Sequence, residues 1–262
     1  MTRLQVDFIQ GAGPIRFGPR GVGLAVAALI ALGVGSAAVA QAVASPFMPE
    51  PAAEVKDFSP AEKLLLMSPQ FGRVKPPSTL GYRFRKTGSL EEGFEDRVSI
   101  ALQRAQGGAC CKAQGQFLSG ARKVSLPEID QVEGNPVTLY FLEHDIRDMK
   151  QRTKGSVTYF RKRIRMALYQ GAELSDVNVT YRGRTLPARE IRLQPYRDDP
   201  NRARFERFVG KQYSFVLSDE VPGAVVAIRT RVPGEAGAAA PLIEEELLLD
   251  GAQVAAAATA RR

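Results

Sequence analysis

The chain has 262 residues, of which 44% are hydrophobic, and a net charge of +8. A chain of this size can bury the core of one domain or of two small ones. One histidine and two adjacent cysteines exclude a zinc site, which needs about four ligands, and no glycine-rich stretch has the Lys-Ser/Thr pair of a phosphate-binding loop. We therefore expect no cofactor and no metal site.

Residues 1–44 follow the pattern of a secretory signal peptide. Three arginines precede an uncharged run over residues 21–40, and two Ala-x-Ala sites end at Ala40 and Ala44, so we expect cleavage directly after one of them. An uncleaved inner-membrane anchor is the alternative, because about 20 apolar residues can span a bilayer. The excess of arginine over lysine, 26 to 10, is typical of GC-rich bacterial genomes, so we expect a periplasmic location.

Residues 45–79 are rich in proline and alanine, which indicates a tether. Within it, Ser59 has the residue type of an N-cap, Pro60 that of a first helical residue, and Glu62 completes a capping box. We expect a short helix over residues 60–67.

Alternating apolar residues predict strands after the tether. Leu80, Tyr82 and Phe84 share one face of the first expected strand. The last two form a hairpin around Ser119-Gly120. The four strands expected here span residues 80–86, 94–102, 114–118 and 122–126.

The middle of the chain has the three- and four-residue spacing of helices. Asn135 and Pro136 have the residue types of an N-cap and a first helical residue. Gly155 is expected to end this helix and Ser156 to cap a second one that ends at Gly171, so that the two form a hairpin. One apolar stripe of the first helix contains Leu139, Leu142, Ile146 and Met149.

Five further strands are expected over residues 174–181, 185–194, 211–217, 224–232 and 242–249. Strands grouped before and after a helical pair favour an α+β fold. We expect a curved antiparallel sheet or incomplete β-barrel whose concave face is covered by the helical hairpin. Residues 80–250 would form this single domain, and residues 251–262 a disordered tail.

Cys110 and Cys111 are adjacent in a glycine-rich stretch that we expect to be a loop. Neighbouring cysteines can close only a strained disulfide ring, and strained disulfides are more easily reduced. A disulfide or redox site, two free thiols, a covalent dimer and an incidental pair are the alternatives.

His144 precedes Asp145, but a metal-dependent phosphohydrolase needs further histidines, and neither Ser119 nor Cys110 stands in a nucleophile motif. The helical position of His144, opposite the leucine stripe, is typical of a packed or half-exposed residue. Acidic pairs such as Asp198-Asp199 fit solvated charge better than acid–base catalysis. We expect no enzyme, with a hydrolase that uses His144 as the minor alternative.

The second helix is the most informative segment, because most of the positive charge lies around it. Residues 147–211 contain 17 lysines and arginines but seven acidic residues. Basic side chains flank a tyrosine and a methionine on the side away from the buried face, and arginines in the following turn extend this patch. A plain solvated face is the alternative. The candidate binding residues are Tyr159, Arg161, Lys162, Arg163, Arg165, Met166, Arg182 and Arg184.

Four stretches carry a resemblance that covers roughly residues 80–250. They are Gly134-Asn135-Pro136, Thr158-Tyr159-Phe160-Arg161, Asp199-Pro200-Asn201-Arg202 and residues 211–223. On these stretches the chain resembles a group of uncharacterised exported proteins of proteobacteria, which implies no function. The element order and a late strand-Pro-Gly-strand pattern are distantly similar to the outer-membrane lipoprotein carrier fold, whose incomplete barrel receives acyl chains. The Pro-rich entry and the central hairpin are longer here.

An exported chain meets lipid headgroups, acidic polysaccharides and acidic proteins, and no nucleic acid. The sequence first favours a non-catalytic periplasmic binding protein for an apolar or lipid-like ligand or an envelope surface, with membrane contact through an uncleaved N-terminal segment. The alternative is an envelope interaction or assembly module that docks a basic helix on an acidic protein. A dry hollow between hairpin and sheet favours the first function, and a filled core the second.

Overall fold

The computed structural model describes residues 57–105, 111–124, 126–235 and 240–255. The predicted signal peptide and most of the predicted tether lie outside these residues, as do Cys110 and the end of the predicted tail. In the part of the chain that is described, no helix is long and apolar enough to cross a membrane.

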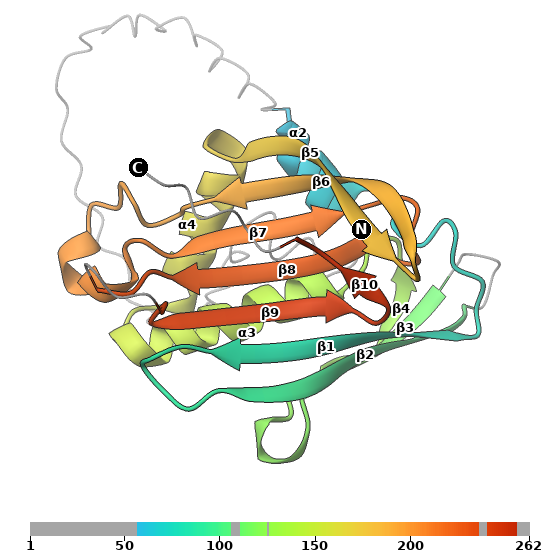
Figure 1. Ribbon diagram of the computed structural model, residues 1–262, viewed down its shortest axis with the longest axis horizontal. Coiled ribbons are helices and arrows are strands. Elements are labelled where there is room, and N and C mark those ends of the chain that lie inside the picture. The colour runs from blue at the N-terminus through green and yellow to red at the C-terminus, as the bar shows by residue number, and fades with distance from the viewer. Residues whose placement is uncertain (1–56, 106–110, 125, 236–239, 256–262) are drawn as a thin grey trace, which may run out of the picture. The chain divides into compact units, whose positions relative to one another are not determined.

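Ten antiparallel strands form one sheet that does not close into a barrel, with the longest helices on one face (Figure 1). The predicted α+β fold is thereby confirmed. In order across the sheet, the strands are β10 (Ala252–Gln253), β5 (Glu173–Tyr181), β6 (Arg184–Leu193), β7 (Gln212–Leu217), β8 (Val225–Val232), β9 (Ile243–Leu249), β1 (Ser78–Thr87), β2 (Phe94–Arg104), β3 (Cys111–Phe117) and β4 (Ile129–Val132). The helices are α2 (Pro60–Glu62) with its π-helical continuation η1 (Lys63–Met67), α3 (Val137–Thr153) and α4 (Val157–Gln170), and short 3-10 turns are η2 (Gly120–Arg122), η3 (Arg202–Arg204) and η4 (Glu206–Phe208).

The inner face of the sheet, beneath α3, carries most of the core. On β1, Leu80, Tyr82 and Phe84 are buried, as their alternation predicts. Neighbouring strands continue the row in register, with Tyr82 opposite Val98 of β2 and Phe84 opposite Leu247 of β9. The predicted leucine stripe of α3 is also buried.

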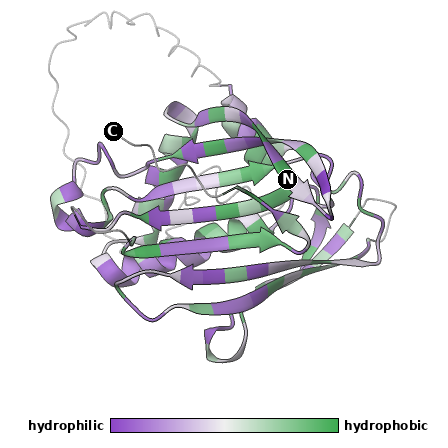
Figure 2. Cartoon of the chain, viewed as in Figure 1, coloured by the Kyte–Doolittle hydropathy of each residue, from purple (hydrophilic) through white to green (hydrophobic). Residues whose placement is uncertain are grey.

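One end of the sheet is buried on its outer face too. Ala227 of β8 and Leu248 of β9 are opposite each other on that face, yet both are buried. β10 contacts β9 and pairs with Tyr181 of β5 (Figure 1), and Val179 and Leu186 of the β5–β6 hairpin are buried as well. Figure 2 shows the consequence, because β8 and β9 are apolar at this end and hydrophilic at the other.

The predicted helix starts are mostly confirmed. The Ser59 side chain accepts a hydrogen bond from the Glu62 N–H, and the Glu62 carboxylate accepts one from the Ser59 N–H. Ser156 caps α4 as expected. α3 begins one residue later than predicted, but the Asn135 side-chain oxygen accepts the Val137 N–H at 3.1 Å.

The predicted hairpin around Ser119-Gly120 is wrong in its second strand. η2 occupies residues 120–122 instead, and Val124 makes only an isolated bridge to Phe117. The strand that pairs with β3 is β4, which comes later in the chain. Residues 118–124 therefore form a turn outside the sheet, and the chain returns to the sheet at β4.

Two predicted irregular segments contain strands. Cys111 is not in a loop, because it begins β3, where it is buried and disulfide-bonded. Ala252 and Gln253, assigned to the tail by the sequence, form β10 against β5. Cys111 pairs with Arg104 of β2 and Val132 of β4, and β10 pairs with β5. In both cases pairing with other strands orders a segment that has too little local pattern to be recognised.

Candidate functional site

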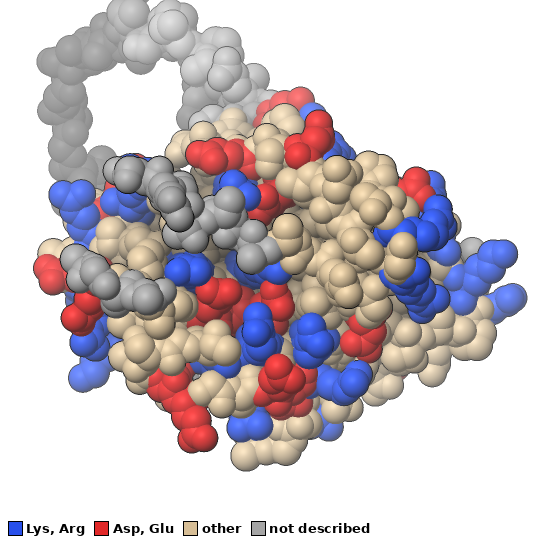
Figure 3. Space-filling model, in the orientation of Figure 1, with Lys and Arg blue, Asp and Glu red and all other residues tan. Residues whose placement is uncertain are grey.

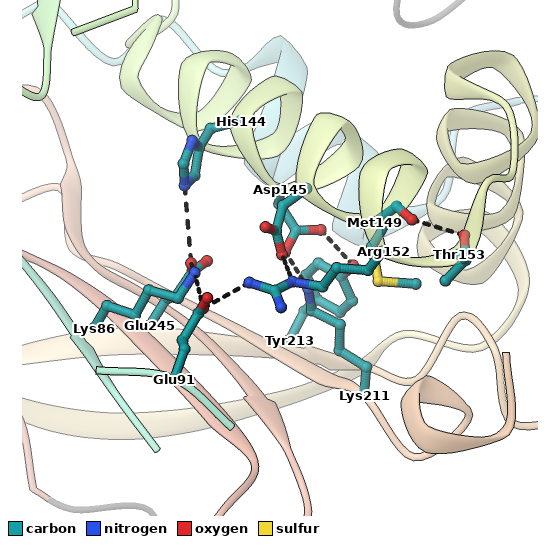
Figure 4. A network of polar contacts seen from close by, with 11 residues as sticks. Lys86, Glu91, His144, Asp145, Met149, Arg152, Thr153, Lys211, Tyr213 and Glu245 are labelled. Carbon is teal, nitrogen blue, oxygen red and sulfur yellow. Dashed lines mark hydrogen bonds and ion pairs between the residues drawn. The ribbon is translucent and has the colours of Figure 1, made fainter. Parts of the chain in front are cut away.

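A network of charged side chains lies between α3 and the sheet (Figure 4). Lys86 of β1 is opposite Glu245 of β9, with Nζ and Oε1 3.1 Å apart. Lys86 also contacts Glu91 at 2.6 Å, and the Glu91 carboxylate accepts a hydrogen bond from Arg152 of α3 at 2.6 Å. This branch ties the C-terminal half of α3 to the sheet.

A second branch is centred on Asp145, which is fully buried on α3. Its carboxylate pairs with the Lys211 ammonium and accepts a hydrogen bond from the Tyr213 hydroxyl at 2.7 Å. The hydroxyls of Tyr213 and Tyr196 lie 3.1 Å apart. Because each buried charge has a partner, this branch is a core ion pair rather than a free acid or base.

The pKa values of the two buried acids of the network are shifted in opposite directions. Burial raises the pKa of Asp145, although Lys211 and Tyr213 oppose the rise. Burial would also raise the pKa of Glu245, but His144, Lys211 and Lys86 outweigh it and lower that pKa to about 2. Opposed shifts are typical of acid–base pairs, but both carboxylates are shielded from solvent, at 0% and 1% exposure, so the network is a structural anchor.

His144 is packed, as its helical position predicts. Its ring lies against Phe84 and Phe117, with centroid distances of 5.7 and 5.3 Å, and its Nε2 is 3.8 Å from Glu245. Among the described residues, no three His, Cys, Asp or Glu side chains form a group that could hold a metal ion. Catalysis by His144 stays a prediction without a contact that favours it.

Three of the predicted binding residues on α4 are engaged within the chain. Arg161 donates to both carboxylate oxygens of Glu143 on α3, at 2.8 and 3.1 Å. Arg163 lies 2.8 Å from Asp199, and the Tyr159 hydroxyl donates to the same carboxylate. These contacts hold α4 against α3 and the loop after β6.

Lys162 and Arg165 have no carboxylate partner among the described residues. Two cations of α3 and the lysine that caps its C-terminus also have no carboxylate partner among the described residues, and the sequence interpretation missed them. All three are exposed, and their spacing of three and four residues was the signal that indicates a surface stripe. We call the five residues the helical basic face: Arg147, Lys150, Lys154, Lys162 and Arg165.

The helical basic face continues from one helix to the other. Glu143 of α3 binds Arg161 of α4, so the two helices touch at this point. Arg147 follows Glu143 by one helical turn, and Arg165 follows Arg161 by one turn. The free cations of both helices therefore flank the same contact.

Arg182 and Arg184 do not belong to this face. They lie in and after the β5–β6 turn, and the nine residues of β5 separate that turn from α4 (Figure 1). The Arg182 guanidinium lies over the Tyr181 ring, 5.2 Å from its centroid. The structure thus divides the predicted patch into two separate regions.

A cleft of about 540 Å³ lies where the outer face of the sheet meets the end of α4. Met166 and Arg163, both predicted for binding, line it. Its floor consists of outward side chains of β6, β7, β8, β9 and β1, and opposite charges alternate there, as Figure 3 shows for this face. Such a polar lining differs from the dry hollow that an apolar ligand requires.

No family model matches the sequence, and no curated protein matches it. Among solved structures, the complex of Pseudomonas aeruginosa MucA/MucB matches with a TM-score of 0.28 and 14% sequence identity. The match covers 69% of this chain and 53% of that one, so this chain spans about half of the length of the matched chain. A likeness at this level supports no functional assignment, and membership of the exported group stays a prediction.

Proposed function

We propose that this chain is a non-catalytic interaction module of the cell envelope that docks an acidic protein partner on its helical basic face. The observation that carries the proposal is the division of the cations on α3 and α4. Arg152, Arg161 and Arg163 are paired, whereas the five cations of the helical basic face have no carboxylate partner among the described residues.

The acids of the two helices do not offset this charge. Glu143 is bound to Arg161, Asp145 to Lys211 and Asp148 to Arg152. The solvent side of the helical layer is therefore uniformly positive, which speeds the approach of an acidic partner and disfavours basic ones.

Two exposed apolar side chains favour a protein partner over a polymer. In the described part of the chain, the large hydrophobic residues that are exposed are Tyr169, at 37%, and Leu174, at 41%. Tyr169 follows Arg165 by one turn of α4, and Leu174 begins β5 just beyond. Aromatic anchors beside cations are typical of protein interfaces.

We rank the binding of an apolar ligand second. Inward residues of α3 such as Phe141, Ile146 and Met149 have no exposed surface, so side chains fill the space between α3 and the sheet. The filled core is the outcome that favours an interaction module.

The test compares two charge-reversed variants of the full chain. Lys162→Glu with Arg165→Glu changes the helical basic face, and Arg182→Glu with Arg184→Glu makes the same change in net charge at the β5–β6 turn. The probes are an acidic Glu-rich peptide and vesicles of anionic phospholipid, each with binding measured at low salt. We expect the first variant alone to lose peptide affinity, by about tenfold for two lost contacts.

Equal losses in the two variants would show that only net charge matters and would contradict the proposal. Binding to the vesicles without binding to the peptide would also contradict it, because a membrane surface would then be the partner. Circular dichroism of both variants checks that the fold is unchanged.

A further inference from the structure

The sheet ends at β5 along an edge that is mostly unpaired. β10 is the outermost strand, but it pairs only with Thr180 and Tyr181 of β5. The first part of β5, residues 173–178, has no partner strand on that side within the described part of the chain. All six of these residues except Val177 are exposed. We call residues 173–178 the free edge of β5.

The register of the β5–β6 hairpin determines which backbone groups point outward. Tyr181 is opposite Arg184 across a two-residue turn, so these two form a hydrogen-bonded pair. Every second residue of β5, counted back from Tyr181, therefore bonds to β6, and the residues between them point their N–H and C=O groups away from it. The outward residues of the free edge are Leu174, Asp176 and Asn178.

The fold already adds a short strand in line with this edge. β10 runs antiparallel to β5, with Gln253 opposite Thr180, and ends there. Arg229 of β8 then donates to the carbonyl oxygens of Val254 and Ala255, at 3.4 and 3.0 Å. No described residue therefore continues β10 along the free edge.

Nothing in β5 itself blocks the addition of a longer strand. Exposed edges are usually kept short, bent by a bulge, or protected by lysine or proline. β5 has nine residues, pairs with β6 in unbroken register, and contains neither lysine nor proline. It therefore has the features of a strand to which an extended peptide can add.

Two acids on the free edge determine which peptide fits. Neither Glu173 nor Asp176 forms an ion pair with a described residue. Arg192, opposite Glu173, binds Glu190 instead, and Arg189 lies opposite Asp176 without an ion pair between them. A lysine or arginine on an added strand would supply a cation opposite Asp176.

A second copy of this chain fits the free edge less well. When the three outward residues pair with those of another copy in an antiparallel ladder, Asp176 of one copy faces Asp176 of the other. Like charges directly opposite each other destabilise strand pairing. The acids thus disfavour self-association and favour a basic strand.

From these observations we infer that the free edge of β5 is a docking site for an extended, basic segment of a partner protein, which adds an antiparallel strand in line with β10. The outward backbone groups bond to this segment, and a lysine or arginine of the segment lies opposite Asp176. The site goes beyond the proposed function, because it lies on the sheet edge and takes a basic segment rather than an acidic one.

Amide hydrogen exchange in the full chain tests this inference, with a hexapeptide of alternating valine and lysine as the probe. In the free chain, we expect fast exchange at the three outward residues and slow exchange at Ser175 and Val177, which bond to β6. With the peptide at about ten times its Kd, exchange at the outward residues should slow by about tenfold. Asp176→Lys should remove this protection. Glu92→Lys, the same charge change at an exposed residue between β1 and β2, should keep it.

Two N-methylated forms of the peptide are the matched controls. The lysine opposite Asp176 lies in a hydrogen-bonded pair, so its own N–H points at β5. Methyl groups on the lysine backbone nitrogens should therefore abolish the protection, whereas methyl groups on the valine nitrogens should keep it. Slow exchange at Ser175 in each variant checks that the β5–β6 hairpin is intact.

Three outcomes would overturn the inference. Equal protection by the two methylated peptides would mean that charge alone binds them. Slow exchange at the outward residues before peptide is added would mean that another segment or a second copy covers the edge. Unchanged exchange with the unmodified peptide would mean that no strand adds. The helical basic face takes no part in this experiment, so its result is independent of the proposed function.

Discussion

At the scale of single residues, buried charge is the main departure from what apolar patterns predict. Lys86, Asp145, Lys211 and Glu245 are all at most 6% exposed, and each would cost several kcal/mol if left alone in the core. They are tolerated because they are paired with one another. Their energetic effect is therefore seen when one partner is removed.

Glu245→Gln tests this coupling through pH. The pKa of Glu245 is about 2 in the folded chain, against 4.5 for an ordinary glutamate, so the charged form is stabilised by folding. We expect a loss of about 3 kcal/mol in the free energy of unfolding near neutral pH. A depressed pKa contributes stability above the ordinary pKa and loses it as pH falls towards the folded value, so the difference between variant and parent should shrink below about pH 4.5. Urea unfolding at a series of pH values measures it, and a difference that is constant with pH would contradict the assignment.

Alanine substitutions at two glycines distinguish the cost of backbone strain from the cost of a steric clash. Gly183 and Gly223 both have positive φ, at 78° and 73°, but a Cβ on Gly183 meets nothing within 4 Å, whereas one on Gly223 lies 2.5 Å from Leu80 and 2.8 Å from Asn135. We expect Gly183→Ala to cost about 1 kcal/mol, from the left-handed backbone alone. Gly223→Ala should cost about 1–3 kcal/mol more, because it also overpacks the core. Thermal unfolding compares them, and equal costs would mean that the core relaxes around the new methyl group.

At the scale of elements, the β5–β6 hairpin has a role that its own pattern does not reveal. It extends the sheet beside β7, and the end of β5 pairs with β10, which contacts β9. Both faces of the sheet are therefore buried at one end, and only the inner face is buried at the other. The polar end is where the cleft lies.

Leu248→Ala tests whether the outer face of β9 is part of the core at this end of the sheet. Leu248 is on the outer face of β9 but only 7% exposed, so its truncation should cost about 2–5 kcal/mol, as for a core leucine. The control is Arg83→Ala, because Arg83 lies opposite Leu248 on β1 and is exposed. It should change stability by about 0.5 kcal/mol or less. A small cost for Leu248→Ala in urea unfolding would mean that this face of β9 is not part of the core.

At the scale of the whole molecule, the sheet separates two surfaces of different character. The helical layer carries unpaired cations, and the outer face of the sheet carries charges that are mostly paired across strands.

Much of the fold follows from local pattern. The strands β1, β2 and β5 to β9 and both long helices were predicted within a few residues, because alternation and three- to four-residue spacing each select one backbone geometry. Ser59 and Ser156 were also assigned correctly, since a cap uses only the N–H groups next to it. β4 and β10 were missed, because segments of two to four residues show too little alternation to be recognised as strands.

The sequence by itself determined the fold class, the helix that carries the positive charge and the packed position of His144, because these depend on residues within one or two turns of each other. Only the tertiary structure decided which cations are free. Arg161 and Arg163 meet Glu143 and Asp199 across 18 and 36 positions of the chain, and no periodicity records a contact between separate elements. The sequence gives the sum of the charged residues, whereas the surface charge depends on which of them the fold brings together in ion pairs.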